Sequence, residues 1–418
     1  MTEKNAKPQL RFAGFDDTWE QRKLSDVATM HARIGWQNLR TSEFLDSGDY
    51  MLITGTDFND GAVNYSTCHF VEKERYEQDK HIQIKNGSIL ITKDGTLGKV
   101  AYVQGLSTPA TLNAGVFNVE IKDETKVDNK YLFQYLKAPF LMDYVDKKAT
   151  GGTIKHLNQN ILVDFPVVMP SKAEQEAIGV YFQQLDNLIT LHQRKYDKLT
   201  NVKKSMLEKM FPKNGSNVPE IRFKGFSDAW EQRKFADVVQ IERGGSPRPI
   251  DDYITDSPNG LNWVKIGDAP AQGHYITKTD EKIRPQGLSK TREVHPGDLI
   301  LSNSMSFGKP YIMGIDGCIH DGWLLIRDTN NTFDLTFLCH LLGTPQMLDQ
   351  YRSLAAGSTV NNLNKELVGN TVVTIPKIDE QRVLGQYLER LDNLITLHQR
   401  ELEKLKNLKK ACLEKMFV

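Results

Sequence analysis

One ten-residue stretch occurs twice in this chain without a change. Residues 185–194 read LDNLITLHQR, and the same letters return at residues 391–400. Both copies continue to a common ending, LEKMF, at residues 207–211 and 413–417. An identical repeat separated by so much intervening chain indicates that the fold is built from two copies of one structural unit.

The repeated stretch carries the residue spacing of a paired helix. From Ile178 and from Leu384, a series of residues returns every seven positions and is apolar except for His192 and His398, with a second, mostly apolar set four residues further on. Between the start of each series and the LEKMF ending, Gly179 and Gly385 are the only glycines and no proline occurs. Each copy is therefore predicted to form a helix about 55 Å long. Because only these two helices share the apolar stripe, they are expected to pair with each other as an antiparallel coiled coil. The pairing is assigned to Leu185, Ile189, His192, Leu199, Leu391, Ile395, His398 and Leu405, with both histidines interpreted as packing residues rather than ligands.

A second block, at the start of each copy, repeats less strictly. PQLRFAGFDDTWEQRKLSDVA at residues 8–28 returns as PEIRFKGFSDAWEQRKFADVV at residues 219–239. Trp19 and Trp230, inside these blocks, are interpreted as core anchors rather than as ligand-stacking residues. The sequences between the matched blocks diverge. We therefore predict an α+β chain with two small mixed α/β domains, each followed by a long helix. The divisions are residues 1–170, helix 171–212, linker 213–218, residues 219–376 and helix 377–418.

Two motifs are shared by the otherwise divergent regions of the two copies. Residues 87–103 and 297–313 both read as strand, polar tip and strand, and each tip ends in Gly-Lys. Glycine allows close backbone approach and lysine suits an anion, although an ordinary hairpin with a solvated lysine gives the same pattern. Residues 151–158 and 357–364 are rich in small, hydroxyl and amide side chains, which bond phosphates and base edges but also form ordinary turns.

Composition and missing motifs argue against an enzyme. The 53 Lys and Arg residues balance 53 Asp and Glu residues, which excludes a uniformly basic surface but not local basic faces. The chain lacks phosphate-loop, dinucleotide-binding, metalloprotease and hydrolase motifs, and it lacks the tetrapeptide of an amino-methyltransferase. The four cysteines are scattered, so no metal site or disulfide is predicted and a cytoplasmic location fits. No signal peptide or membrane-spanning run is recognised.

Two related units with different variable domains suit a split DNA sequence. Antiparallel helices would place the two domains about a pseudo-twofold axis, and dimeric readers of DNA contact half-sites about 34 Å apart. Since the variable domains differ, the two halves of the target should differ as well. Basic residues occur near the glycine-bearing loops of both units, as a DNA backbone requires.

The chain resembles the specificity subunit of type I restriction-modification systems over its whole length. The resemblance rests on the duplicated WEQRK block, on GSILITKDGTLGK at residues 87–99 and on the turn TGGT at residues 150–153. It also rests on Pro-x3-Glu-Gln at residues 170–175 and 376–381, directly before the two long helices.

The resemblance implies a non-catalytic DNA-binding chain of a restriction system. In that family each variable region is a target recognition domain, and the paired helices act as a ruler for the spacer between the two half-sites. Partners would be double-stranded DNA, two methyltransferase subunits and nuclease-translocase subunits. S-adenosylmethionine for DNA methylation, and ATP and Mg for restriction, would be held by the partners, with no cofactor or metal in this chain. The predicted DNA contacts are Lys93, Thr96, Lys99, Thr153, Lys155, His156, Arg243, Arg248, Asn303, Ser304, Lys309, Thr359, Asn361 and Asn362.

Two other functions remain open from the residues alone. A tandem scaffold that binds proteins or glycans, with the coiled coil as spacer, would suit the zero net charge. DNA affinity that does not fall with salt would favour the scaffold, because phosphate neutralisation imposes a steep salt dependence. A nuclease with a dispersed site is disfavoured, since no acidic cluster is matched between the copies.

Overall fold

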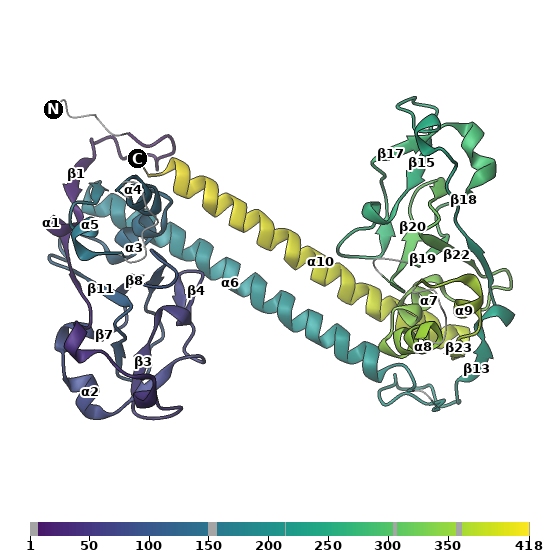
Figure 1. The fold of residues 1–418 in the computed structure, drawn as a ribbon, viewed down its shortest axis with the longest axis horizontal. Coiled ribbons are helices and arrows are strands. Elements are labelled where there is room, and N and C mark those ends of the chain that lie inside the picture. Colours follow the sequence, from purple (N-terminus) through teal and green to yellow (C-terminus); the bar gives the residue numbers. More distant parts are fainter. Residues whose placement is uncertain (1–6, 149–156, 214, 304–306, 357–361, 418) are drawn as a thin grey trace. The chain divides into compact units, whose positions relative to one another are not determined.

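The heptad stretches fold into two helices of equal length. In the computed structural model, α6 (Lys172–Lys209) and α10 (Ile378–Lys415) each contain 38 residues, about 57 Å at 1.5 Å per residue. The structure describes residues 7–148, 157–213, 215–303, 307–356 and 362–417. Its contacts divide the chain into unit 1, residues 1–191 with 402–418, and unit 2, residues 192–401. Each unit thus holds one segment of both long helices (Figure 1).

The helices pair in antiparallel fashion within each unit. In unit 1, Asp186 near the start of α6 accepts a hydrogen bond from Lys409 near the end of α10. In unit 2 the order reverses, and Lys203 late in α6 donates to Asp392 early in α10. Leu185, Ile189, Leu391 and Ile395 are buried, and Leu199 and Leu405 are half-buried against the cores of units 2 and 1. His192 Nδ1 lies 3.1 Å from His398 Nδ1. The predicted fold class is confirmed.

The two variable regions, which share little sequence, have matching sheets. Unit 1 contains a larger sheet in the order β2-β11-β8-β9-β5-β4 and a four-stranded sheet in the order β6-β3-β10-β7. Unit 2 contains β14-β22-β19-β20-β16 and β17-β15-β21-β18, so the strands correspond one to one except for the extra edge strand β4. Each unit also has a two-stranded antiparallel sheet, β1-β12 or β13-β23.

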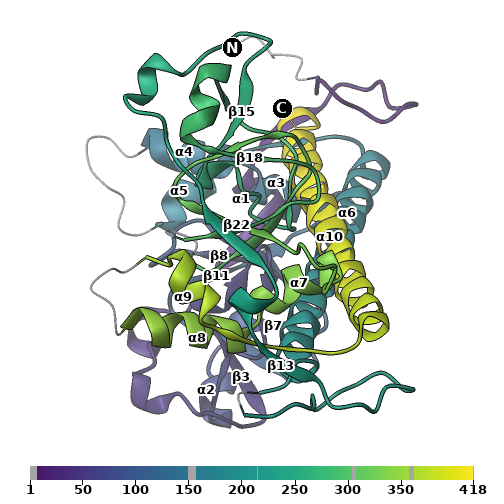
Figure 2. The same cartoon turned by 90° about the vertical axis from the view of Figure 1, so that its right-hand side faces the viewer.

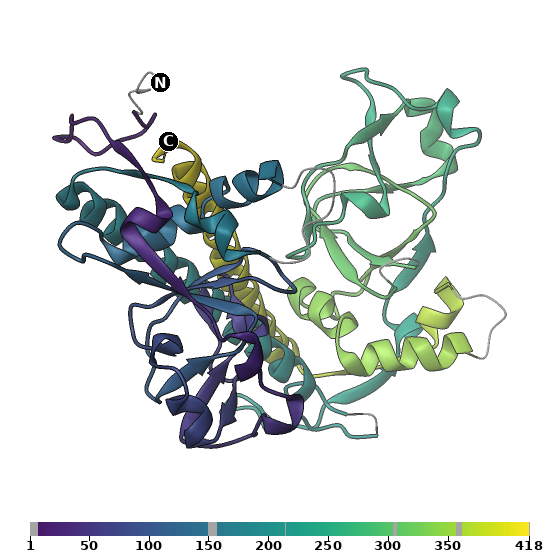
Figure 3. The same ribbon diagram turned by 60° about the vertical axis from the view of Figure 1, so that its left-hand side comes forward.

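The strands of unit 1 are β1 (Glu20–Lys23), β2 (Ala28–His31), β3 (Tyr50–Ile53), β4 (Phe58–Asn59), β5 (Ala62–Val63), β6 (His69–Val71), β7 (Gln83–Ile84), β8 (Ile89–Thr92), β9 (Val100–Tyr102), β10 (Ala110–Leu112), β11 (Val116–Ile121) and β12 (Pro166–Met169). Its shorter helices are α1 (Leu24–Val27), α2 (Lys73–Glu77), α3 (Asn129–Lys137), α4 (Phe140–Lys148) and α5 (Gln159–Val163). In unit 1, α3, α4 and α5 gather near α6, whereas α2 and the four-stranded sheet lie at the other end (Figures 1 and 3).

The strands of unit 2 are β13 (Glu231–Lys234), β14 (Gln240–Arg243), β15 (Leu261–Val264), β16 (Tyr275–Ile276), β17 (Glu281–Ile283), β18 (Arg292–Val294), β19 (Leu299–Ser302), β20 (Pro310–Met313), β21 (Gly317–Ile319), β22 (Trp323–Arg327) and β23 (Val372–Ile375). Its shorter helices are α7 (Leu335–Leu342), α8 (Pro345–Ala356) and α9 (Lys365–Gly369). These three helices gather away from β15, β17 and β18 (Figures 1 and 2).

The repeated LEKMF ending completes the core of each unit. In unit 1 the ring of Phe417 stacks on Phe182, with centroids 5.6 Å apart. In unit 2 the ring of Phe211 stacks on Phe337 at 5.7 Å. Phe417 and Phe211 are 3 % and 2 % exposed. The helix α6 therefore begins in unit 1 and ends in the core of unit 2, and α10 begins in unit 2 and ends in the core of unit 1. Both ends of each helix have a packing role, which explains why the sequences of both ends are repeated.

The repeated N-terminal blocks close each unit with a buried ion pair. Arg11 makes two hydrogen bonds to the Glu174 carboxylate, at 2.7 and 2.8 Å, and Arg222 makes the equivalent bonds to Glu380, both at 2.7 Å. Trp19 in the same block is 6 % exposed and its counterpart Trp230 is 3 % exposed, which confirms the core-anchor interpretation. The described parts of the chain contain no helix with the length and apolar character that a bilayer crossing requires.

Both interior helix glycines allow close packing of a second helix. A Cβ atom at Gly385 would lie 2.5 Å from Thr336 Oγ1 and 2.8 Å from Asp334 Oδ1, at the start of α7. A Cβ atom at Gly179 would lie 2.7 Å from Asp128 Oδ1, at the start of α3. The same close approach in both units explains why the helices keep a residue of poor helix propensity.

Gly385→Ala is expected to destabilise unit 2. Alanine favours an isolated helix by about 1 kcal/mol, but overpacking costs about 1–3 kcal/mol. The added Cβ atom would also lie 2.8 Å from the backbone nitrogen of Phe337, which cannot move away without displacing α7. Urea unfolding should show a lower midpoint for Gly385→Ala than for the wild-type chain. Gly267→Ala is the control, because a Cβ atom at Gly267 meets nothing within 4 Å. Equal midpoints for the two variants would contradict the packing role.

Candidate nucleic-acid interface

The Gly-Lys tips are closed by the same backbone hydrogen bond in both units. The tip between β8 and β9 is closed by a hydrogen bond of 2.9 Å from Gly98 N to Thr92 O, and the tip between β19 and β20 by a bond of 2.9 Å from Gly308 N to Ser302 O. The two glycines have φ of 70° and 72°, a conformation that favours glycine over residues with a side chain. The lysine that follows each glycine is thus placed at the same point of each hairpin.

The end of the second predicted motif lies beside the Gly-Lys tip in both units. Leu157, directly after residues 149–156, donates its N–H to Lys93 O at 2.8 Å. Leu363, after residues 357–361, donates its N–H to Asn303 O at 3.0 Å. Two segments that are about 60 residues apart in the sequence therefore meet at the tip of each larger sheet.

In unit 1 the tip presents an exposed basic and hydroxyl surface. Thr96 and Lys99 are exposed. Lys93 is half-buried, and its ammonium lies 5.5 Å from the centroid of the Phe117 ring, a distance at which a cation and an aromatic ring attract each other. The three side chains offer a hydroxyl and two ammonium groups, which suit phosphate oxygens.

In unit 2 three predicted residues gather around one aspartate. Asn303 is 2 % exposed and donates its amide to Asp321 O at 2.8 Å, and Arg243 Nε donates to the same oxygen at 3.3 Å. The Arg248 guanidinium lies 4.0 Å from the Asp321 carboxylate. The Asn303 side chain is thus engaged within the protein. The sequence did not indicate Asp321. The matching position in unit 1, before β11, is Ala114, and Asp321 belongs to no repeated acidic motif.

Lys309 occupies a different environment from Lys99. Its ammonium lies 5.0 Å from the Tyr311 ring centroid and 3.5 Å from Ala271 O. It also lines a cavity of about 350 Å³, together with Lys203 and His274. Asn362 is exposed. The other predicted contacts lie outside the described residues and stay predictions: Thr153, Lys155, His156, Ser304, Thr359 and Asn361.

Behind the tip of unit 2, a buried ionic network joins four elements around Asp392 of α10. Lys203 of α6 and His274, which precedes β16, both donate to its carboxylate, His274 at 3.0 Å. His340 Nε2 of α7 lies 3.7 Å from the same carboxylate. In unit 1 the matching carboxylate is Asp186, which bonds Lys409 and the Gln134 amide at 2.8 Å. Among the described residues, the network therefore contains histidines in unit 2 only.

The network sets distinct protonation states. Burial by itself would lower the pKa of His274, but hydrogen bonds to Asp392 and Cys339 raise it to about 9. Burial, with the nearby His274 and Lys203 charges, lowers the pKa of His340 to about 3. Burial opposes ionisation of Asp392, yet its bonds to His274 and Lys203 lower its pKa to about 2. Two cations thus share one carboxylate while His340 stays neutral. Because the Lys203 ammonium already pairs with Asp392, we assign this cluster as an ion-pair network rather than as a metal site.

Lys99→Ala is expected to weaken binding to double-stranded DNA of any sequence. If the exposed ammonium neutralises one phosphate, the slope of log affinity against log salt should fall by about one. Fluorescence anisotropy at several salt concentrations measures this slope. Lys85→Ala is the matched control, since Lys85 is also exposed but lies before β8, at the opposite end of the strand from the tip. A slope unchanged in Lys99→Ala would assign Lys99 to solvent.

Comparison with known proteins places this geometry in a family. Residues 16–201 and 227–407 each match the model for the type I restriction modification DNA specificity domain. The chain is 25 % identical over 350 residues to the type I restriction enzyme MjaVIII specificity subunit of Methanocaldococcus jannaschii, covering 79 % of this chain and 78 % of that protein. It is 20 % identical over 334 residues to the EcoBI specificity subunit of Escherichia coli, covering 74 % and 69 %.

A solved structure shares the fold. The S subunit of a type I restriction-modification system from M. genitalium superposes with a TM-score of 0.66 over 99 % of both chains, at 15 % sequence identity. The two matches to the family model together cover most of the 418 residues, one in each half of the chain. The chain therefore belongs to the family of type I restriction-modification DNA specificity proteins, with two copies of the family's domain.

Proposed function

We propose that this chain is the non-catalytic DNA-recognition subunit of a type I restriction-modification complex. The observation that carries the proposal is the pair of identically closed tips, at residues 92–99 and 302–309, each on the larger sheet of its unit. Each tip ends in a lysine, and each accepts a hydrogen bond from the leucine that follows a run of small and hydroxyl residues in the sequence. The repeated closing hydrogen bonds, combined with different side chains, support two DNA-recognition domains of one type.

The two readers should recognise different sequences. Lys93 in unit 1 corresponds to Asn303 in unit 2, because the backbone oxygen of each accepts a hydrogen bond from the leucine next to the end of the second motif. Asp321 of unit 2 corresponds to Ala114 of unit 1. A carboxylate can accept from the cytosine amino group, whereas alanine makes only apolar contact. We therefore propose an asymmetric target with two separate halves, one half for each unit.

The chemistry would belong to other subunits. We propose that two methyltransferase subunits with S-adenosylmethionine, and nuclease-translocase subunits with ATP and Mg, assemble on this chain in the cytoplasm. The related proteins are named as specificity subunits of type I restriction enzymes, which supports these partners. The contribution of this chain is to position the partners on a chosen sequence.

Methylation mapping tests the proposal. Single-molecule sequencing of host DNA, with and without this gene, should reveal methylated adenine at one bipartite motif that depends on the gene. Replacing residues 30–150 with the corresponding region of another family member should change one half of that motif and leave the other half intact. The absence of any split motif, with the methyltransferase partner present, would contradict the function.

A further inference from the structure

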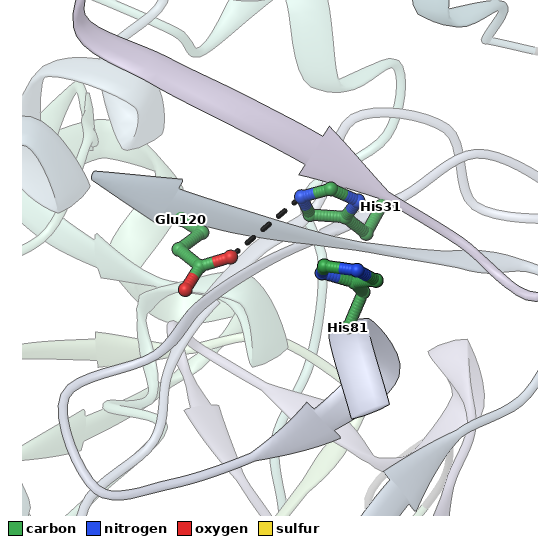
Figure 4. Close-up of side chains that lie close together, drawn as sticks. All are labelled: His31, His81 and Glu120. Carbon is green, nitrogen blue, oxygen red and sulfur yellow. Dashed lines mark ion pairs between the residues drawn. The ribbon is translucent and has the colours of Figure 1, made fainter. Parts of the chain in front are cut away.

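Two histidines and a glutamate converge on the surface of unit 1 (Figure 4). His31 is the last residue of β2, Glu120 lies on β11, and His81 lies in the short 3-10 helix η4 (Lys80–Ile82). The two imidazole rings stack, with centroids 4.6 Å apart and planes 20° apart. His31 Nε2 lies 3.6 Å from Glu120 Oε2, and one donor atom from each of the three residues lies within 4.8 Å of the other two.

The backbone beneath the three side chains is fixed to one strand. In the antiparallel β2-β11 pair, His31 is opposite Asn118 and Glu120 is opposite Thr29, so His31 and Glu120 are diagonal neighbours. Asn118, 6 % exposed, donates its side-chain amide to His81 O at 3.0 Å. The His81 N–H donates to Asp79 Oδ1 at 2.9 Å. One strand, β11, therefore positions all three groups.

The chemistry of these groups selects a class of ion. Two imidazole nitrogens and one carboxylate oxygen are the ligands that zinc and neighbouring divalent transition metals prefer. With metal–ligand bonds of about 2.1 Å, tetrahedral ligands lie roughly 3.4 Å apart, close to the separation between His31 and Glu120. The Glu120 side chain is 56 % exposed, so rotation about its bonds can adjust the distance from its carboxylate to each imidazole.

We propose that His31, His81 and Glu120 bind a divalent transition-metal ion of the zinc class, with water completing its coordination. Among the described residues, no ammonium or guanidinium group pairs with the Glu120 carboxylate, in contrast to the lysine on Asp392 in unit 2. The carboxylate charge beside two imidazoles is thus available to a cation.

Unit 2 provides an internal contrast for this site. The strand register places Glu242 and Arg327 of the β14-β22 pair where unit 1 has His31 and Glu120. Arg327 pairs with Asp298 at 2.8 Å, so the matching position carries a cation that is already paired. The proposed site belongs to unit 1 only and is not part of the repeated architecture.

Calorimetric titration of the full chain with zinc chloride tests the proposal. We expect one saturable site with Kd of about 1–10 μM, and His81→Ala should weaken it at least about tenfold, which corresponds to 1.4 kcal/mol. Glu120→Gln should also weaken it, because the amide lacks the charge. His69→Ala is the matched control, since it removes another histidine of unit 1 that lies outside the cluster.

Thermal unfolding separates loss of the site from loss of the fold. His81 is exposed, so His81→Ala should unfold at the wild-type temperature without zinc and should lose the zinc-induced rise that His69→Ala keeps. Absence of saturable zinc binding below about 1 mM would overturn the proposal. Equal zinc affinity in His81→Ala and His69→Ala would overturn it as well.

Discussion

Asp392→Asn should destabilise unit 2 by about 3–5 kcal/mol, since removing one partner of a buried ionic network leaves the other charges uncompensated. The Asp392 and Lys203 side chains are 13 % and 17 % exposed, so water can screen little of the change. Asparagine keeps the shape of the side chain, and the effect should therefore come from the lost charge. Urea unfolding at neutral pH measures the difference in free energy of unfolding.

The pH dependence of this effect identifies its source. The ordinary pKa of histidine, 6.5, is raised to about 9 at His274 in the folded chain. The pairing of His274 with Asp392 therefore contributes fully below pH 6.5 and is lost as the pH rises through 9. The difference between wild type and Asp392→Asn should be larger at about pH 6 than at about pH 9.5, where only the Lys203 pairing remains.

Asp197→Asn is the control for this experiment. Asp197 is an exposed carboxylate of α6 in the same unit, and its replacement should change the free energy of unfolding by less than about 0.5 kcal/mol. If Asp392→Asn were as stable as Asp197→Asn, with the same pH profile, the network would contribute nothing to the fold.

Arg222→Ala should produce the second large loss, also about 3–5 kcal/mol. Glu380 lies in the first turn of α10 with its side chain 5 % exposed, and Arg222 supplies both of the hydrogen bonds that neutralise its carboxylate. Alanine would leave this carboxylate buried without its counter-charge. Hydrogen exchange should accelerate in the first turns of α10, because the Arg222–Glu380 pair fastens the N-terminal block of unit 2 to that helix.

Arg233→Ala gives the comparison for Arg222→Ala. Arg233 belongs to the same repeated block, but its side chain is 49 % exposed and its partner Glu231 is 61 % exposed, so little stability should be lost. Arg11→Ala should repeat the large loss in unit 1 through Glu174, whose side chain is 1 % exposed. Similar stability of Arg222→Ala and Arg233→Ala would show that the buried pair is replaceable by water.

The long helices were predictable because their signal is local. Heptad spacing from Ile178 and Leu384 specifies a helix whatever it packs against, and α6 and α10 contain both stretches. Two close contacts between helices were only partly predictable from the sequence. Gly179 and Gly385 were visible as exceptions in the helix pattern, but only the structure shows that α3 and α7 begin against them.

The individual motifs of the candidate interface were predictable from the sequence, but the contacts between them were not. The Gly-Lys tips were recognisable because glycine and flanking β-formers mark a hairpin. The sequence did not indicate that Asn303 is engaged with Asp321 O, since that bond joins residues 18 apart across a turn and depends on where β22 begins. Thr96 and Lys99 are exposed and accessible, while the role of each predicted contact in binding DNA remains a prediction.

The sequence by itself determined the duplication, the two long helices and the absence of recognisable catalytic motifs, because these features reside in runs of consecutive residues. Only the tertiary structure decided that the divergent regions share one strand order, since sheets of the same topology tolerate different side chains. It also decided which distant side chains meet: Asp392 with Lys203 and His274, and His31 with His81 and Glu120. Those meetings depend on packing between segments far apart in the chain, which no local pattern records.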